Sequence, residues 1–419
     1  MNPMDCALLI LLVCTGFYTA WNIGANDVAN AMGTSVGSGA LSLKRAVWIA
    51  ACLEFFGAFF FGSHVSKTIQ SGLIDPDFFA NQPYLLVYGM LASLGAAGVW
   101  LHVASYLGQP VSTTHSIVGA LVGFGLVAGG WEAIYWTNIG QIALSWILSP
   151  LLGGLTGYYL FSFLRKHIFY ALDPLKAMYR LTPLLVFLVS TVLAAIAIFE
   201  GFYHLHRDFS IVWSLSAVVG LALVSTLIAW WYCTSASKKL RFEESHAEYA
   251  KVEALFSYLQ IVSACMMAFA HGANDVANAI GPLSAAVGVM RSGVVSLENA
   301  VVPSWTLALG GAGIVAGLAT WGWRVIETIG KKITELTPSR GFAAEFSTAL
   351  TILLASRLGM PVSTTHTLVG AVIGVGFARG LESVNLITMR EIIISWLVTV
   401  PVGAGIAVAL YYPIQWVFR

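Results

Sequence analysis

Long apolar runs separated by short polar stretches dominate the chain. A run of about 20 apolar residues is long enough to cross the hydrocarbon core of a bilayer as a helix. Such runs lie at about 5–22, 46–62, 83–107, 139–163, 182–200, 211–232, 254–271, 300–323 and 391–413. Three shorter apolar segments, 116–128, 345–358 and 367–378, add one span each if they cross. The pattern predicts an all-α polytopic membrane protein with about 12 transmembrane segments.

Composition excludes several other classes of protein. Of the 419 residues, 58% are hydrophobic and 10% are charged, whereas soluble proteins have about 45–50% apolar and about 25% charged residues. This composition excludes a soluble enzyme and a disordered protein. The formal net charge of +1 provides no basic field for a polyanion, so we expect no nucleic-acid partner. The five cysteines stand singly in apolar runs, which indicates neither a disulfide framework nor a zinc site.

The positions of Lys and Arg predict the orientation in the membrane. With about 12 spans and the N-terminus outside, most of the 21 Lys and Arg residues fall in loops on the inner side, as in membrane proteins generally. We therefore predict a multi-pass protein of the cell membrane with both termini outside. The longest polar stretch, 238–253, is then cytoplasmic.

Two motifs each occur twice in the chain. The segment GANDVANA occupies Gly24–Ala31 and again Gly272–Ala279. The segment PVSTTH occupies Pro110–His115 and again Pro361–His366. Because both motifs recur in the same order at nearly the same separation, the chain contains an internal repeat.

The duplication divides the chain into two related units, 1–165 and 251–419, joined by residues 166–250 with two spans and the cytoplasmic loop. The first unit and the linker together contain an odd number of spans, so the second unit enters the membrane from the opposite side. The number stays odd if the short segments form re-entrant hairpins with discontinuous helices, an alternative that the sequence leaves open. Inverted-topology repeats are typical of secondary transporters, whose sites lie near the bilayer midplane.

The GANDVANA segments place polar residues at membrane depth. These residues are Asn26, Asp27, Asn30, Asn274, Asp275 and Asn278. An ionised Asp is costly there unless it is paired or coordinated, and carboxylate and amide oxygens suit a hard cation. Gly24 and Gly272 would allow the helix to unwind and present backbone carbonyls. A polar turn or a helix cap explains one copy, but two copies in opposite orientations favour a cation site.

The PVSTTH segments place hydroxyl groups at predicted helix starts. Pro110 and Pro361 end one helix and favour the start of the next. The hydroxyl groups belong to Ser112, Thr113, Thr114, Ser363, Thr364 and Thr365. A helix N-terminus with free N–H groups attracts an anion, although N-capping and close helix packing also account for part of the pattern. Two anion sites facing two Asp/Asn clusters suit an oxyanion symporter.

Further polar residues in or beside apolar segments are candidates for coupling or gating. They are Glu54, Glu345, His115, His366 and Arg357. The alternative for Glu345 is a position at a helix end, and the alternative for Arg357 is packing against an acid. The alternative for the two histidines is structural hydrogen bonding. His271 precedes only the second GANDVANA copy and so breaks the symmetry.

No set of residues indicates catalysis. A membrane phosphatase would need a nucleophile beside a base, and Thr114 and His115 are adjacent in sequence only. A passive anion channel is a further alternative, but paired acids would repel an anion in an open pore. We therefore expect a transporter without catalytic residues.

The duplicated GANDVANA resembles the signature of the PiT family of inorganic phosphate transporters. The resemblance covers both units and implies import of inorganic phosphate by symport with sodium ions, with alternating access. A proton-coupled phosphate or sulfate permease of the same family is the alternative. The short polar stretch at 238–253 resembles that of a compact prokaryotic-type member.

The resemblance also implies roles for individual residues. It assigns phosphate to the two Ser-Thr-Thr runs together with Asn26 and Asn274, and it assigns sodium to the six Asp and Asn residues around Asp27 and Asp275. Glu54 and Glu345 match intramembrane acids that are important in animal members. Sodium is then a co-substrate, no other cofactor is expected, and a homodimer is implied because some members form one.

Overall fold

The structure is a computed structural model that describes residues 3–200, 210–237, 245–295, 302–357, 362–380 and 385–418. The described part is helical and holds no β-strand beyond one isolated bridge between Ile74 and Ile134. The predicted all-α class is therefore confirmed. Residues 238–244 of the predicted cytoplasmic loop lie outside the described residues, and so does Pro361.

The helical elements follow one another with short connections. They are α1 Pro3–Gly37, α2 Leu43–Phe61, α3 Ser63–Ser71, η1 Pro76–Phe79, α4 Pro83–Tyr106, α5 Thr113–Ala128, η2 Trp131–Ala133, α6 Trp136–Leu164, η3 Arg165–Phe169, α7 Pro174–Ala195, η4 Ile196–Glu200, α9 Ile211–Ser237, α10 Ser245–Ser292, α11 Ser304–Thr320, α12 Trp323–Glu327, η5 Thr328–Lys332, α13 Pro338–Arg357, α14 Thr364–Arg379 and α15 Leu386–Phe418. The two GANDVANA copies lie inside the continuous helices α1 and α10. The expectation that the helix unwinds at Gly24 and Gly272 is therefore wrong.

Seven helices of the described part are long and apolar enough to cross a membrane. They are Pro3–Gly37, Pro83–Tyr106, Trp136–Phe169, Pro174–Phe199, Ile211–Ser237, Glu248–Ser292 and Leu386–Phe418. The chain bends by 60° between α11 and the helical segment Trp323–Gly330. If these two segments count as one broken span, the number rises to eight. Helices α5 and α14 begin at the two Ser-Thr-Thr runs, and we call them the hydroxyl helices. Each has only 16 residues and is shorter than a full span. The number of about 12 spans stays a prediction.

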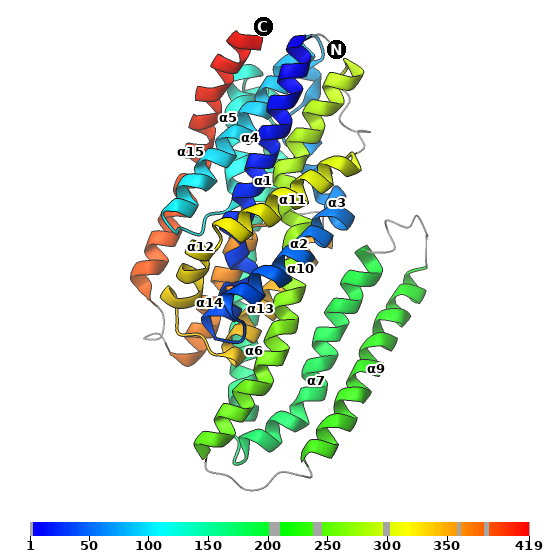
Figure 1. The fold of residues 1–419 in the computed structure, drawn as a ribbon, viewed down its shortest axis with the longest axis vertical. Helices are drawn as coiled ribbons and strands as arrows, with labels where there is room; N and C mark the ends of the chain where they lie inside the picture. The colour runs from blue at the N-terminus through cyan, green and yellow to red at the C-terminus, as the bar shows by residue number, and fades with distance from the viewer. Residues whose placement is uncertain are drawn as a thin grey trace.

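The two GANDVANA helices form the centre of the molecule. Figure 1 shows that α1 and α10 run in opposite directions, and the two helices pack against each other. Both termini lie at the same end of the molecule (Figure 1). Helices α7 and α9 stand to one side, where α9 packs on α7 and α7 packs on α10 (Figure 1).

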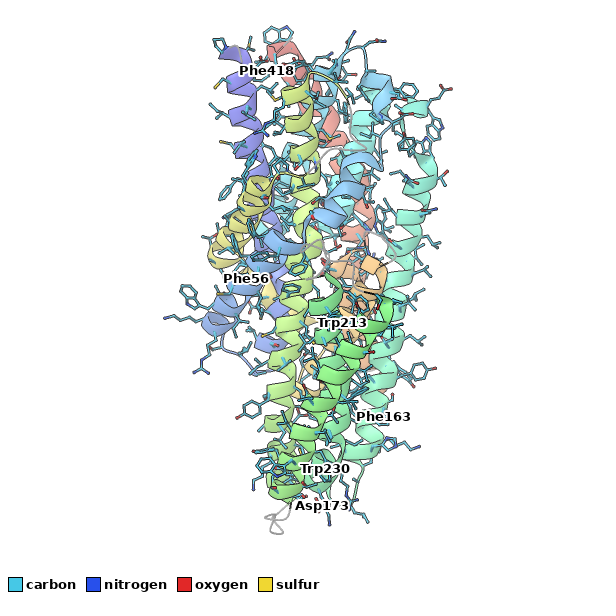
Figure 2. All side chains as sticks on the ribbon, turned by 90° about the vertical axis from the view of Figure 1, so that its right-hand side faces the viewer. Phe56, Phe163, Asp173, Trp213, Trp230 and Phe418 are labelled. Atoms are coloured by element: carbon cyan, nitrogen blue, oxygen red, sulfur yellow. The ribbon has the colours of Figure 1, made fainter. Side chains whose placement is uncertain are left out.

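Apolar side chains cover much of the outer surface, as Figure 2 shows with all side chains drawn. Trp213 and Trp230 of α9 are 45% and 56% exposed, and Phe56 of α2 is 51% exposed. Exposed Trp, Phe and Leu side chains over this length suit hydrocarbon and not water. The surface and the long apolar helices together indicate a multi-pass membrane protein.

Each GANDVANA helix packs closely on a helix of the other predicted unit. A Cβ added at Gly24 of α1 would lie 2.0 Å from the backbone oxygen of Ile314 in α11. A Cβ added at Gly272 of α10 would lie 2.2 Å from the backbone oxygen of Glu54 in α2. Because no side chain fits at these distances, the two motif glycines permit close helix crossings.

The hydroxyl helices pack in the same reciprocal manner. A Cβ added at Gly119 of α5 would lie 2.5 Å from the backbone oxygen of Val400 in α15. A Cβ added at Gly370 of α14 would lie 2.2 Å from the backbone oxygen of Pro150 in α6. These crossings hold the N-terminal ends of α5 and α14 in the middle of the molecule, beside α1 and α10.

Candidate functional site

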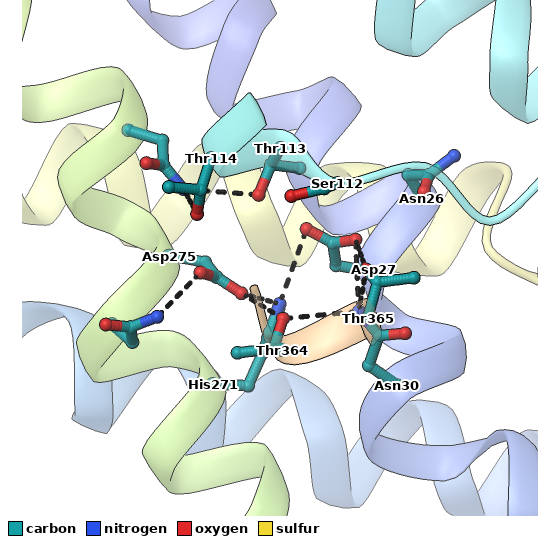
Figure 3. Close-up of polar contacts among 12 residues, drawn as sticks. Asn26, Asp27, Asn30, Ser112, Thr113, Thr114, His271, Asp275, Thr364 and Thr365 are labelled. Carbon is teal, nitrogen blue, oxygen red and sulfur yellow. Dashed lines mark hydrogen bonds and ion pairs between the residues drawn. The ribbon is translucent and has the colours of Figure 1, made fainter. Parts of the chain in front are cut away.

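The duplicated polar residues meet in one buried centre, which Figure 3 shows in close-up. Each of them is at most 4% exposed. They are Asn26, Asp27 and Asn30 of α1; Asn274, Asp275 and Asn278 of α10; Ser112, Thr113 and Thr114 at the start of α5; and Ser363, Thr364 and Thr365 at the start of α14. The four segments are far apart in the sequence, and the structure brings all of them together.

The first hydroxyl of each run caps its helix. The Ser112 side chain accepts a hydrogen bond from the His115 backbone N–H at 3.2 Å. The Ser363 side chain accepts one from the His366 backbone N–H, also at 3.2 Å. The capping interpretation therefore holds for these two serines. The caps fix where α5 and α14 begin, and so they fix where the following threonines stand.

The threonine hydroxyls bond to the Asp and Asn side chains of the motif helices. Thr364 Oγ1 donates to Asp275 Oδ2 at 2.7 Å, and Thr365 Oγ1 donates to Asp27 Oδ1 at 3.2 Å (Figure 3). Asn278 Nδ2 donates to Thr113 Oγ1 at 3.1 Å. The bonds of Thr365 and Thr113 run between the two predicted units, so hydroxyls of one unit contact the GANDVANA residues of the other.

The paired asparagines make different contacts in the two copies. Asn26 Nδ2 donates to Ser105 Oγ at 3.1 Å and to the Gln109 oxygen at 3.0 Å, while its Oδ1 accepts from the Val111 N–H at 3.1 Å. These bonds hold the segment that leads into α5. Asn274 Nδ2 donates to Asp275 Oδ1 at 3.0 Å, and Asn274 Oδ1 has no hydrogen-bond partner among the described residues.

A buried histidine links three acids at this centre. His271 Nε2 lies 2.9 Å from Asp275 Oδ2 and 3.8 Å from Asp27 Oδ2, and His271 Nδ1 lies 3.3 Å from Glu54 Oε1. All four side chains have 0% exposure. The sequence singled out Glu54 but assigned no contact to His271. The sequence contained one signal for this contact: His271 precedes the second motif, whereas Ile23 precedes the first.

The centre offers oxygen and nitrogen ligands to a cation. One atom each from Asp27, His271 and Asp275 lies within 4.8 Å of the others. Asp27 Oδ2, Asn30 Oδ1 and Asn274 Oδ1 are buried acceptors without a hydrogen-bond donor in the described part of the chain. A buried acceptor without a donor is costly, and a cation would satisfy it. The carboxylate and amide oxygens among these groups fit a hard cation.

Glu345 lies in a separate polar cage beside this centre. Its Oε1 accepts from Thr34 Oγ1 and, at 2.6 Å, from Ser35 Oγ, and its Oε2 accepts from Ser263 Oγ at 2.7 Å. Gln260 Nε2 donates to Oε1 at 3.3 Å. Glu345 lies within α13 and not at either end of that helix, and its side chain is fully buried. The interpretation of Glu345 as a helix-end residue is therefore wrong.

In the described part of the chain, His115 and His366 contact each other and not the acids. The centroids of their rings lie 4.2 Å apart. Within the described ranges their rings have backbone hydrogen bonds with Trp396 and Trp146, respectively, and no carboxylate pairs with either ring. The side chain of Arg357 lies outside the described residues.

Comparison with known proteins places this geometry in a family. Residues 23–407 match the phosphate transporter family. The chain is 49% identical to the chloroplastic inorganic phosphate transporter 2-1 of Arabidopsis thaliana, over 96% of this chain and 71% of that protein. A Chlamydia pneumoniae protein whose name proposes a phosphate permease is 48% identical, over 98% of this chain and 99% of its own length.

A solved structure supports the same assignment. The structure of a sodium-dependent phosphate transporter is similar, with a TM-score of 0.89 and 42% sequence identity. The similarity covers 98% of this chain and all of that one. The resemblance inferred from the duplicated motifs is thereby confirmed. This chain belongs to the phosphate transporter family, whose members are transporters and not enzymes.

Proposed function

We propose that this protein imports inorganic phosphate by symport with sodium ions, with alternating access around the buried centre between α1, α5, α10 and α14. The observation that carries the proposal is the arrangement of two hydroxyl-bearing helix N-termini around two buried aspartates. An anion and its accompanying cations need opposite ligand types within one small volume, and this centre supplies both.

The anion would bind at the starts of α5 and α14. Each helix N-terminus carries about half a positive charge and backbone N–H groups without partners in the helix. Thr113 and Thr114 from one side, and Thr364 and Thr365 from the other, add hydroxyl donors. Phosphate oxygens would take over donors that now bond to the Asp side chains. Binding of phosphate would therefore free carboxylate oxygens for cations.

Charge balance accounts for the sodium ions. Asp27 and Asp275 are fully buried, and an anion next to two carboxylates is repelled unless cations are bound as well. Sodium is a hard cation that carboxylate and amide oxygens can bind. The sodium dependence named for the similar solved structure supports this choice. Sodium would then supply the driving force, because each charge that moves inward across 100 mV yields about 2.3 kcal/mol.

Glu54 and Glu345 would link sodium to the conformational cycle. Glu345 accepts hydrogen bonds from four uncharged groups, and no basic side chain pairs with it in the described part of the chain. The four donors offset part of the cost of a negative charge at this buried position, and a cation that reaches Glu345 would neutralise that charge. Glu54 acts on the centre itself through His271.

We propose the following architecture for the transport cycle. Residues 1–165 and 251–419 are inverted repeats, residues 166–250 join them with two spans and the cytoplasmic loop, the whole chain forms about 12 spans, and both termini face outward. The antiparallel course of α1 and α10 and the reciprocal glycine contacts support this arrangement (Figure 1). We retain the homodimer as part of the proposal because some members of the family form one.

Uptake of labelled phosphate into proteoliposomes tests the proposal. We expect accumulation under an inward sodium gradient and loss of that accumulation in Asp27→Asn and Asp275→Asn. Ser292→Ala, an exposed substitution at the end of α10, is the control and should transport normally. Equilibration of phosphate without any gradient, or accumulation that ignores sodium, would contradict sodium symport.

One observation favours a second candidate, proton-coupled transport. His271 lies between Glu54 and Asp275, so a proton there could take the place of one sodium ion. Uptake driven by an inward proton gradient in sodium-free buffer would support this alternative. Suppression of phosphate uptake by excess sulfate would indicate a sulfate permease instead.

A further inference from the structure

Two histidines follow the hydroxyl runs and are not used by the proposed anion and cation sites. His115 and His366 are 5% and 3% exposed. Their rings meet edge to face, with centroids 4.2 Å apart. The contact joins α5 of the first predicted unit to α14 of the second, immediately behind the threonines that line the centre.

Two tryptophans extend this contact on both sides. The ring of Trp146 in α6 lies 3.6 Å, centroid to centroid, from the ring of His115. The ring of Trp396 in α15 lies 3.6 Å from the ring of His366. The four rings form a series in the order Trp146, His115, His366, Trp396, which we call the ring stack. It draws one side chain from each of four helices.

The ring stack is unsuited to carrying a proton. Neither imidazole has a carboxylate partner among the described residues. His115 has a backbone hydrogen bond with Trp396, and His366 has one with Trp146. The two indole nitrogens have no hydrogen-bond partner in the described part of the chain. A protonated His115 would face the second imidazole without a carboxylate beside it. A proton on either ring is therefore costly, because like charges repel and a buried charge without a partner is unfavourable. We therefore consider the ring stack for the space that its four rings fill.

That volume lies where the two hydroxyl helices meet. Helix α5 packs mainly on α4 and α15, whereas α14 packs on α6 and α13. The two helix starts meet through the His115–His366 contact and through a bond of 3.3 Å from Thr365 Oγ1 to the Val111 oxygen. The ring contact is the bulkier of these, and it lies one residue beyond Thr114 and Thr365.

We propose that the ring stack fixes the distance between the two hydroxyl runs, which makes His115 and His366 positioning residues for the anion. The inference rests on the proposed function, in which phosphate is held between the starts of α5 and α14. Hydrogen bonds weaken steeply as distance and angle depart from their optimum, and binding groups must stand within about 0.5 Å of the productive geometry. A stack with one ring removed would let the helix starts move and would weaken phosphate binding.

Kinetics of sodium-driven phosphate uptake test the proposal with four single variants. His115→Ala and His366→Ala remove one ring, while His115→Phe and His366→Phe keep a ring without its nitrogens. We expect the Ala variants to raise the KM for phosphate about tenfold while the maximal rate stays within about threefold. We expect the Phe variants to keep a KM within about threefold of the unmodified protein. The double variant H115A/H366A should be no worse than the poorer single variant, because the stack acts as one unit.

The control is His167→Ala. His167 also packs on an aromatic ring, that of Phe163 at 4.3 Å, but at an exposed position after α6. This variant should leave the KM unchanged. If an Ala variant does not fold to a monodisperse protein, the KM of the Phe variants decides.

Two results would overturn the inference. The first is an unchanged KM in the Ala variants that fold. The second is a tenfold rise in the Phe variants, which would show that the ring nitrogens matter and not the spacing. Failure of the unmodified protein to take up phosphate would instead overturn the proposed function, so the two failures are distinguishable.

Discussion

The two halves of the buried centre contain the same motifs, but different residues pack against each motif copy. Behind the second GANDVANA copy, His271 bonds to Glu54 of α2. At the equivalent places behind the first copy stand Ile23 and Ile314, both fully buried and apolar. The duplicated residues therefore form a nearly symmetric site, while the residues that contact them from behind are polar on one side only.

The same contrast appears further from the centre. The second unit contributes Glu345, Gln260 and Ser263 to the polar cage. At the same separations along the sequence from its own motifs, the first unit has Leu94 in place of Glu345, Leu12 in place of Gln260 and Thr15 in place of Ser263. Leu94 and Leu12 are both buried. On the proposed function, the duplicated residues would bind phosphate and cations, and we infer that the residues that differ between the halves would couple sodium to the transport cycle.

The largest expected effect comes from Glu54→Gln. Removing one partner of a buried pair costs about 3 kcal/mol in stability. In the protein that folds, we expect sodium-driven uptake to fall roughly 100-fold, because Gln cannot carry the charge that pairs with His271. The equivalent change on the apolar side, Ile314→Val, should cost about 1 kcal/mol or less in stability and leave uptake within about twofold. Equal losses in both variants would show that the two sides are not functionally different.

Glu345→Gln should have the next largest effect. We expect sodium-driven uptake to fall about 30-fold and to need a higher sodium concentration, because Gln cannot carry the negative charge that a cation would neutralise in the cage. The matched control at the equivalent position, Leu94→Met, should change uptake by less than about threefold. Initial rates at several sodium concentrations measure the effect. An unchanged sodium dependence in Glu345→Gln would remove the cage from the coupling scheme.

The motif glycines test the symmetric part of the comparison. Gly24→Ala and Gly272→Ala each place a Cβ within 2.0 or 2.2 Å of a backbone oxygen, so each should destabilise the protein by about 1–3 kcal/mol. Gly288→Ala lies in α10 with no atom within 4 Å of the new Cβ and should stabilise the helix by up to about 1 kcal/mol. Thermal unfolding in detergent compares the three. A clear difference between the two motif variants would indicate that the crossings are not equivalent.

The smallest effects are expected at the two serine caps. Ser112→Ala and Ser363→Ala should each cost about 1 kcal/mol and raise the KM for phosphate about fivefold, by the same amount in both. Ser210→Ala removes a cap that accepts from the Trp213 N–H at the exposed start of α9. It should lower stability without changing the KM. Unequal effects on KM at the two motif caps would show that phosphate is held mainly by one unit.

The sequence was sufficient to predict the membrane class, the duplicated motifs and most of the polar residues that meet in the candidate site. Those features depend on local chemistry, such as apolar runs of spanning length, Asp at membrane depth and hydroxyls after a proline. The expected unwinding at Gly24 and Gly272 was wrong for a physical reason. Glycine permits an irregular backbone, but it also permits close helix packing, and the neighbours Ile314 and Glu54 that decide between these come from distant segments.

Other features were decided only by the tertiary structure. The helix crossings set which threonine bonds to which aspartate, brought Glu54 within reach of His271, and enclosed Glu345 in hydroxyl groups. They also turned His115 and His366 toward each other. Residue types and spacing determine which chemistry is available in this chain. Long-range packing between the two units determines which groups share that chemistry, because the contacts join residues that lie hundreds of positions apart.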